Sequence, residues 1–390
     1  MTLNSRDYAV IVVGSGFFGA TIAYKVASEL GLPVLVIERR KHVGGNAYSE
    51  RDPDTGIEFH RYGSHLFHTS SLEVWNFITR FTSFNNYRHR VFAKHRGRTY
   101  TMPINLMTIN QFFGLDLTPT EAKTFIAEQA SAGGVAQPQS LEAKAISLIG
   151  RPLYEAFIRG YTTKQWETDP AILPPDILTR LPVRFSYNDF YFSDLYEGLP
   201  IDGYGALFER MLNNPNIHVR TNCDFFDVRR EIDSRTLVVY TGAVDRYFDY
   251  RYGELGWRTL DFEIEALDID DFQGAAVMNY PDLDVRFTRI HEFKHLHPER
   301  RYGKRTLIMR EFSRFATRGD EPYYPIGIRD DKERYGRYRA AAESEPKVVF
   351  GGRLGTYRYL DMHQAIGAAL ASYQKKIAPR LTQPAVKALR

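Results

Sequence analysis

The first elements that the hydrophobic pattern predicts are a strand, a turn, a helix and a second strand. An apolar run over residues 8–13 leads into the turn GSGFFG (residues 14–19), and apolar residues then recur at helical spacing as far as Gly31. A second apolar run, residues 34–37, ends at Glu38. A glycine-rich turn between a strand and a helix is the context that a dinucleotide-binding motif requires.

Residues 104–166 change to a helical pattern. The sequence TPTE at residues 118–121 is a capping box with proline in the first turn of a helix. Gly150, followed by Pro152, ends one helix and starts another. This stretch predicts a bundle of helices inserted after the first unit.

Aromatic and β-branched residues with strand-like alternation dominate residues 181–198 and 258–313 and predict an antiparallel sheet. Alternating helix and strand return over residues 205–242 and again over residues 348–374. The predicted fold is therefore α/β: a discontinuous Rossmann-like domain with a helical-bundle insertion and an antiparallel β-sheet domain. The expected division is 1–88, 202–250 and 340–390 for the dinucleotide-binding domain, 104–180 for the helical domain, and 89–103, 181–201 and 251–339 for the sheet domain.

The turn of residues 14–19 has the glycine spacing of a dinucleotide-binding motif. Gly14 permits the tight turn, Gly16 lets the backbone approach a pyrophosphate, and Gly19 allows close packing of the helix. The N-terminus of the helix offers free amides and the positive end of its dipole to the phosphates. Phe17 lies within this turn and is an expected cofactor contact.

The residues after the second strand favour FAD. Glu38 is placed to accept hydrogen bonds from an adenosine ribose, whereas Arg39 and Arg40 leave NADP open as an alternative. Gly45 and Asn46 offer a second backbone approach that suits the ribityl chain of FAD, and an ordinary loop with glycine turns is the alternative. The sequence contains no second GxGxxG, so NAD(P)H is expected only as an external reductant, or another reductant in its place.

Composition narrows the classes of protein further. The chain has 390 residues, 43% hydrophobic and 25% charged, enough to bury a large core in two or three domains. Cys223 is the single cysteine, which excludes an intrachain disulfide and a CxxC centre and fits a reducing cytoplasm. The formal net charge of +4 is too balanced for a sequence-independent nucleic-acid binder. No apolar run of membrane-spanning length and no secretory segment are found, so we expect a cytoplasmic protein without a nucleic-acid or membrane partner.

Several long sequence words stand in order over nearly the whole chain: GSGFFG, GGNAYSE, RYGSHLFHT, MPINLMTINQFF, LYEAFIRGYTTKQW, RLPVRF, VMNY, EPYYPI and GGRLGTYRYLDM. Together they resemble the UDP-galactopyranose mutase family of the prokaryotic type. The resemblance implies a flavoprotein isomerase of cell-surface polysaccharide biosynthesis that interconverts UDP-galactopyranose and UDP-galactofuranose, and that works only with reduced FAD. It implies that flavin N5 is the nucleophile on the anomeric carbon and UDP the leaving group, with a flavin–sugar adduct and an iminium that permits ring opening and reclosure.

The resemblance also implies a set of substrate contacts. Arg180, on a loop over residues 173–184, and Arg289 resemble two arginines that clamp the diphosphate, and guanidinium forks suit bidentate contact with phosphate oxygens. Tyr161 resembles the residue that stacks on uracil, with Phe157 one helical turn before it. The other expected contacts are Thr162, Trp166, Tyr191, Phe192, Tyr324, Tyr359 and His89, the last of which stands where many relatives carry Asn.

Further residues resemble flavin contacts of that family: Arg353, Tyr359, Asp361 and Met362 near the C-terminus, and His65 in the loop expected beside the flavin ring. A helix that begins near Met362 would direct its N-terminus at the flavin pyrimidine and stabilise negative charge on the reduced ring. His65 is expected to act in catalysis beside the two arginines.

Three other patterns suggest different chemistry. Residues 291–295 spell HExxH, but they continue an alternating strand, so their histidines are not expected to share a helix face as zinc ligands. His60, His65 and His68 are more simply explained as hydrogen-bonded loop histidines, and no metal site is expected. The basic residues of 88–98 alternate with apolar ones as in a half-exposed strand, which argues against RNA contact.

Two alternatives to the isomerase stay open. A flavin amine oxidase, or a related oxidoreductase, shares the glycine motif, the acidic residue and the second glycine turn. A non-enzymatic sensor of UDP-sugars would bind substrate without turnover. We also expect the protein to form a homo-oligomer.

Overall fold

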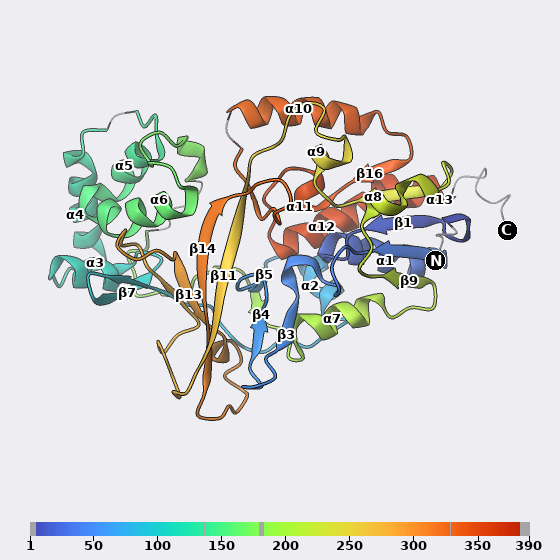
Figure 1. Ribbon diagram of the computed structural model, residues 1–390. Helices are drawn as coiled ribbons and strands as arrows, with labels where there is room; N and C mark the ends of the chain where they lie inside the picture. The colour runs from blue at the N-terminus through green and yellow to red at the C-terminus, as the bar shows by residue number, and fades with distance from the viewer. Residues whose placement is uncertain (1–4, 136, 179–182, 328, 383–390) are drawn as a thin grey trace.

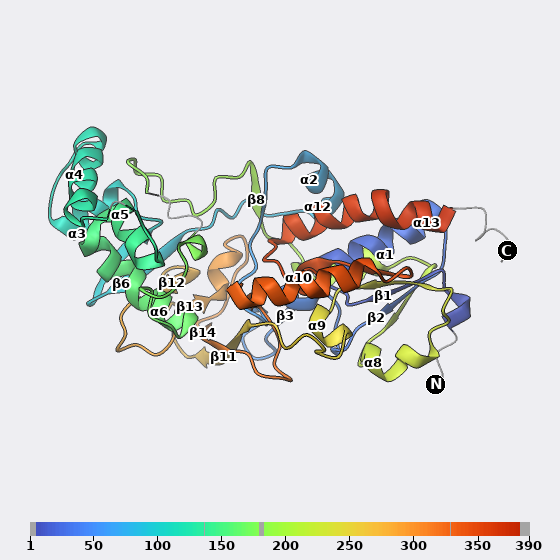
Figure 2. The same ribbon diagram turned by 90° about the horizontal axis from the view of Figure 1, so that it is seen from above.

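The computed structural model describes residues 5–135, 137–178, 183–327 and 329–382. Three bodies lie in a row: a group of helices at one end, an antiparallel sheet in the middle, and a parallel sheet with its covering helices at the other end. Figure 1 shows this row from the side, and Figure 2 shows the same order from above. The antiparallel sheet therefore separates the helical group from the dinucleotide-binding part.

The parallel sheet has five strands, in the order β16 (Val348–Phe350), β10 (Leu237–Tyr240), β1 (Val10–Val13), β2 (Val34–Ile37) and β9 (Ile217–Arg220). All four residues of β1 are buried, because helices and further strands cover both faces, and this explains its uninterrupted apolar run. Helix α1 (Phe17–Leu30) packs against α12 (Met362–Ser372) and α7 (Gly203–Leu212). The strands come from three separate stretches of sequence, which confirms the discontinuous Rossmann-like fold.

The antiparallel sheet has seven strands, in the order β15 (Tyr324–Pro325), β11 (Trp257–Leu267), β14 (Thr306–Phe315), β13 (Arg289–Glu292), β12 (Val277–Asn279), β6 (Val91–His95) and β7 (Arg98–Met102). Every neighbouring pair is antiparallel except β12 with β6. In the β13–β14 pair, Arg289 lies opposite Glu311. This register places the side chain of Glu311 next to that of Arg289.

The expectation of sheet strands over residues 181–198 was wrong. Among the described residues of this stretch, only β8 (Tyr196–Gly198) is a strand, and it pairs with β5 (Phe67–Thr69) in a separate two-stranded sheet. A second small sheet joins β3 (Ser49–Arg51) to β4 (Glu58–His60). The aromatic residues before β8 alternate for another reason: Phe192 stacks on the His68 ring, with 3.7 Å between centroids.

The helical group consists of α3 (Leu106–Phe113), α4 (Pro119–Ala132), α5 (Leu141–Leu153), a π-helical turn (Tyr154–Arg159) and α6 (Gly160–Trp166). Thr118 and Glu121 form the capping box of α4, as the sequence predicts. Gly150 breaks α5 with φ 76°, and a Cβ there would lie 2.7 Å from Cβ of Gln129, so α4 and α5 approach closely at this point.

The remaining helices are α2 (Leu72–Ile78), α8 (Phe225–Val228), α9 (Val244–Tyr247), α10 (Arg329–Glu343), α11 (Gly352–Gly355) and α13 (Ala378–Thr382). Within the described ranges, none of the helices combines the length and the apolar character that crossing a membrane would require.

Candidate active site

A cavity of about 600 Å³ opens beside the carboxyl ends of the parallel strands. Its walls include Gly14, Glu38 and Thr241, which directly follow β1, β2 and β10, and Gly352, which comes shortly after β16. In open α/β sheets this is the edge where nucleotides bind. Most of the expected cofactor contacts line it: Gly14, Gly16, Phe17, Gly19, Glu38, Arg39, Gly45, Asn46, His65, Arg353 and Met362.

The glycine turn between β1 and α1 has no room for side chains. Gly14 has φ +95°, and a Cβ on it would lie 2.1 Å from Oγ1 of Thr241, which donates to the Val13 carbonyl. A Cβ on Gly19 would lie 2.0 Å from the carbonyl oxygen of Gly14. Gly16 is the N-cap of α1, so the free amides of the first helical turn lie at the cavity wall.

Glu38 is fixed against this turn. Its Oε2 accepts hydrogen bonds from the backbone N of Ser15 (3.0 Å) and from Ser15 Oγ (2.6 Å), and its Oε1 accepts from the backbone N of Arg40 (3.0 Å). The side chains of Arg39 and Arg40 both pair with Glu321, at 2.5 and 2.9 Å. Because that carboxylate already compensates the two arginines, a 2′-phosphate has less positive charge to bind than the sequence suggests.

A second glycine turn packs against the first. Gly45 has φ +57°, and a Cβ on it would lie 3.1 Å from Cα of Gly16. Arg40 donates to Oδ1 of Asn46 (2.7 Å), which holds this turn beside the end of β2. Two backbone turns therefore face one cavity, the arrangement expected for an extended dinucleotide.

His65 and Arg353 also line the cavity. Arg353 donates to the carbonyls of Tyr323 (3.1 Å) and Leu360 (2.7 Å), and its guanidinium lies 4.7 Å from the ring centroid of Tyr359. Tyr359 and Asp361 themselves are not part of the cavity lining that includes Arg353. Their contact with a cofactor stays a prediction.

His65 is neutral and held in one orientation. Burial is the main cause that lowers the pKa of His65 to about 4. Its Nδ1 lies 2.7 Å from the carbonyl of Gly63 and must donate to it, which leaves Nε2 as an acceptor. The backbone of the same residue donates to Nδ1 of His60 (2.9 Å) and accepts from the hydroxyl of Tyr204 (3.0 Å). The loop beside the cavity is therefore well anchored.

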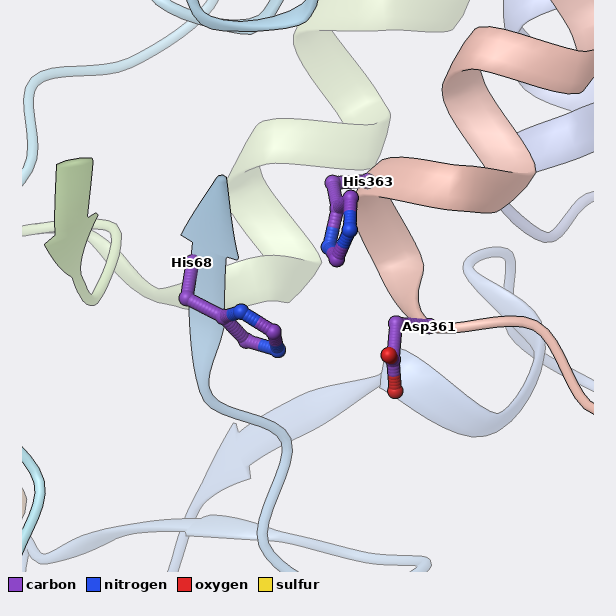
Figure 3. A group of neighbouring side chains, drawn as sticks. All are labelled: His68, Asp361 and His363. Atoms are coloured by element: carbon purple, nitrogen blue, oxygen red, sulfur yellow. The ribbon is translucent and has the colours of Figure 1, made fainter. Parts of the chain in front are cut away.

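Figure 3 shows three polar side chains near the start of α12: His68 on β5, and Asp361 and His363 at the beginning of the helix. Their ligand atoms lie within 4.8 Å of one another. Nδ1 of His68 is, however, 2.6 Å from Oδ2 of Asp194, and Asp361 forms the capping box of α12 with Gln364. His68 and Asp361 thus have uses within the protein other than metal ligation, and the absence of a metal site stays a prediction.

Arg289 lies beyond the cavity, on the antiparallel sheet. Its Nε is 3.3 Å from Oε1 of the buried Glu311, and its Nη2 donates to the hydroxyl of Tyr161 on α6. Burial alone would raise the pKa of Glu311, but the charge of Arg289 and the hydrogen bond from His291 lower it, so the carboxyl group is ionised. Tyr324 connects the two regions, because both Arg289 and Arg353 are among its charged neighbours.

The other expected substrate contacts have different surroundings. Tyr191 is exposed and packs edge-on against Phe192, at 5.0 Å between centroids. Trp166 ends α6, and its carbonyl lies 3.5 Å from the guanidinium of the buried Arg258, a residue that no sequence pattern singled out. Thr162 is buried in α6.

His89 lies within this aromatic group. It is 4% exposed, and its Nδ1 is 3.0 Å from the hydroxyl of Tyr87. Its ring packs near those of Tyr191 (5.6 Å) and Phe192 (6.0 Å). The residue that departs from the family pattern is therefore close to the expected substrate contacts.

Phe157 lies four residues before Tyr161, in the π-helical turn that leads into α6. It is 5% exposed and packs edge-on against Tyr100, with 5.1 Å between centroids, in the core of the helical group. A contact between Phe157 and a base would need this core to rearrange. Arg180, the other expected clamp residue, lies outside the described residues.

Lys164 joins α6 to the segment that precedes β13. Its ammonium nitrogen is within hydrogen-bond distance of four backbone carbonyls, which share its three protons: those of Tyr280 (2.5 Å), Asp282 (2.8 Å), Val285 (2.8 Å) and Phe287 (3.0 Å). This contact fixes the helix that carries Tyr161 relative to the strand that carries Arg289. Sequence reasoning missed Lys164, as it missed Glu311, because both act through partners that are distant in the chain.

The fold and the cavity together define a dinucleotide-binding enzyme of the Rossmann type, and comparisons with known proteins agree. A model of the NAD(P)-binding Rossmann-like domain matches residues 12–81. A model of the UDP-galactopyranose mutase family matches residues 156–359, and the chain belongs to this family of isomerases.

Curated relatives cover nearly the whole chain. A probable UDP-galactopyranose mutase of Klebsiella pneumoniae is 43% identical over 369 residues, 94% of each chain. A dTDP-fucopyranose mutase of Escherichia coli is 41% identical over 376 residues, 94% of this chain and 97% of the relative. The crystal structure of a reduced UDP-galactopyranose mutase matches with a TM-score of 0.73 at 14% identity, over 98% of both chains. A putrescine oxidase variant matches at a TM-score of 0.56 and 12% identity, so the alternative oxidase shares only the fold.

Proposed function

We propose that the protein is a flavin-dependent isomerase that interconverts UDP-galactopyranose and UDP-galactofuranose. The observation that carries the proposal is the position of Arg289. An arginine held by a buried carboxylate and a tyrosine lies outside the lining of the dinucleotide cavity, with Tyr324 near both this arginine and Arg353, which is in the lining. A nucleotide sugar could place its diphosphate at Arg289 and its sugar toward the cavity.

The cavity fits FAD. The amides at the start of α1 would hold the pyrophosphate, Glu38 the adenosine ribose, and the Gly45 turn the ribityl chain. His65, Arg353 and the start of α12 would lie around the isoalloxazine ring. When bound and reduced, FAD would supply an electron-rich N5 as the nucleophile for the anomeric carbon of the sugar. We propose NAD(P)H, or another external reductant, as the source of electrons.

The chain's own residues bind and orient the substrate. Arg289, and Arg180 from its loop, would hold the diphosphate and stabilise UDP as it departs. Tyr161 would carry the uracil and would also orient Arg289 through its hydroxyl. His65, neutral because of its burial, presents Nε2 as a hydrogen-bond acceptor beside the cofactor without adding a positive charge there.

A second substrate pair is supported by one relative. The dTDP-fucopyranose mutase of Escherichia coli is nearly as similar to the chain as the probable UDP-galactopyranose mutase is. The two nucleotides differ in one methyl group on the base and one hydroxyl on the ribose, and the two sugars differ at C6. We favour the UDP-sugar because the family model and several relatives bear that name.

The experiment is a conversion assay with chemically reduced, FAD-loaded protein. UDP-galactofuranose and dTDP-fucofuranose are supplied in separate reactions, and the pyranose products are separated by chromatography. We expect conversion of the UDP-sugar with the higher kcat/KM, and none with the oxidised protein. A higher kcat/KM for the dTDP-sugar would reassign the substrate. No conversion of either sugar, with oxygen consumption and substrate-driven flavin bleaching, would favour an oxidase instead.

We also propose that the protein acts in the cytoplasm as a homo-oligomer and takes no part in nucleic-acid or membrane binding. The single cysteine supports this location, because a chain without an intrachain disulfide suits a reducing environment. Sedimentation of the FAD-loaded protein tests the oligomer, and a monomer at micromolar concentration would contradict it.

A further inference from the structure

A buried chain of polar contacts leads from the loop beside the cavity to Arg289. Oγ of Ser64 is 2.7 Å from Nδ1 of His291, and Nε2 of His291 is 3.0 Å from Oε2 of Glu311. The other carboxylate oxygen of Glu311 is 3.3 Å from Nε of Arg289. Ser64 directly precedes His65, which lines the cavity, so the chain connects the two halves of the site.

The contacts have one consistent set of donors. An ionised carboxylate only accepts, so the proton of His291 must be on Nε2, and Nδ1 must accept from the hydroxyl of Ser64. His291 is 1% exposed, and burial lowers its pKa, so the neutral ring that this pattern requires is the form present. The imidazole therefore joins the hydroxyl and the carboxylate with both of its nitrogens satisfied.

Arg289 depends on Glu311 for its orientation. Among the described residues, its Nε has an ion-pair partner in Glu311 but no hydrogen bond of good geometry, and its Nη2 has the Tyr161 hydroxyl. The Glu311 carboxylate is held by His291 at Oε2 and more loosely by Thr288 at Oε1, 3.4 Å away. Without His291 the carboxylate could rotate, and the guanidinium would follow it.

We propose that His291 is a positioning residue: with Ser64 it sets the orientation of the Arg289 guanidinium through Glu311, and so ties diphosphate binding to the loop beside the cofactor. The proposal rests on the proposed function in one respect, the role of Arg289 as a diphosphate ligand. The proposal thus assigns a structural role in the site to the first histidine of the HExxH sequence. The glutamate of that sequence, Glu292, has other partners: it accepts hydrogen bonds from Thr306 (2.6 Å) and from two backbone amides.

The test measures binding of UDP to the FAD-loaded protein by titration calorimetry. We expect His291→Leu to raise the Kd for UDP about tenfold, since it removes a hydrogen bond to a charged group. Ser64→Ala should raise it less, and His291→Gln, whose amide can still donate to Glu311, should lie between His291→Leu and the wild type. His295→Gln is the matched control, because His295 pairs with Asp271 and should leave the Kd unchanged.

A double-mutant cycle distinguishes a positioning role of His291 from a general disturbance of the structure by the substitution. If His291 acts through Arg289, His291→Leu should change the Kd less than twofold when Arg289 is already alanine. An equal fold-change in both backgrounds, or a wild-type Kd in His291→Leu, would overturn the proposal. Should His291→Leu lose its flavin or fail to fold, Ser64→Ala and His291→Gln are taken through the same cycle. A wild-type protein that binds no UDP at all would instead count against the proposed function.

Discussion

Glu311 lies opposite Arg289 across the β13–β14 pair, and its carboxylate is 3.3 Å from Nε of that arginine. The carboxylate is almost completely buried, at 3% exposure, whereas the arginine reaches partly into the open. A buried anion thus holds the arginine in place from one side. The part of the side chain that stays exposed is the part that a diphosphate would contact.

Arg289→Ala should lower kcat/KM by about 30-fold or more, because loss of one member of a buried charge pair costs about 2–5 kcal/mol. Arg289→Lys should recover little, since a point charge cannot reproduce the fork. Both variants should keep bound FAD, because Arg289 is not part of the cavity wall. Arg180→Ala is expected to behave in the same way. Turnover and the flavin-to-protein absorbance ratio are the measurements, and full activity in either alanine variant would remove that arginine from the clamp.

Gly14→Ala should abolish retention of FAD. The new Cβ would lie 2.1 Å from Oγ1 of Thr241 at a residue with φ +95°, so the turn would have to move. Gly336→Ala is the control, because a Cβ at this position of α10 meets nothing within 4 Å and should stabilise the helix by about 0.5–1 kcal/mol. Flavin content after gel filtration decides, and a Gly14→Ala protein with full flavin content would argue against this turn as the pyrophosphate site.

Phe157 and Tyr161 should respond differently to truncation. Phe157→Ala should lower the free energy of unfolding by about 3–5 kcal/mol, because it leaves a cavity in the core of the helical group. Tyr161→Phe keeps the ring and removes only the hydroxyl that accepts from Arg289, so it should raise KM a few-fold with little loss of stability. Urea unfolding and steady-state kinetics separate the two. Phe157→Leu with normal stability but a much higher KM would restore the stacking role of Phe157.

Acid should destabilise the protein through His89. Burial first, and the charge of Arg289 second, lower the pKa of His89 to about 3, whereas the unfolded chain has the ordinary value near 6.5. Between these values the unfolded state binds more protons, so stability falls as the pH falls. At pH 5 the loss relative to pH 8 is about 2 kcal/mol for this residue. His89→Asn should reduce the pH dependence of urea unfolding by that amount, whereas replacement of the exposed His218 should leave it unchanged.

Removal of divalent metal ions should leave turnover unchanged. His68 is already bonded to Asp194, and Asp361 already caps α12, so the group in Figure 3 has uses other than metal ligation. The measurement compares the reduced, FAD-loaded protein before and after dialysis against EDTA. Activity that is lost on dialysis, returns with Zn²⁺, and does not return in His363→Gln would establish a metal ion at this group.

Local sequence patterns predicted strands well where every residue of the strand is buried. The strands of the parallel sheet are continuous apolar runs, and Gly14 and Glu38 belong to one short unit, so both could be identified without knowledge of the tertiary structure. The prediction of sheet strands before β8 was wrong because the alternating aromatic residues there do not form the core of a sheet. One of them, Phe192, stacks on His68 instead. Glu311 could not be found, since its pairing with Arg289 depends on the register of two strands. Ser64 and His291 lie 227 positions apart, and no periodicity connects them.

The four carbonyls around the Lys164 ammonium group have a mechanical consequence. Any hinge that swings the helical group away from the central sheet must either break this cluster or carry the segment before β13 along with α6. Tyr161 and Arg289 would therefore move together as one rigid unit. The width of the substrate entrance would then depend on chain segments that are not held by such a cluster.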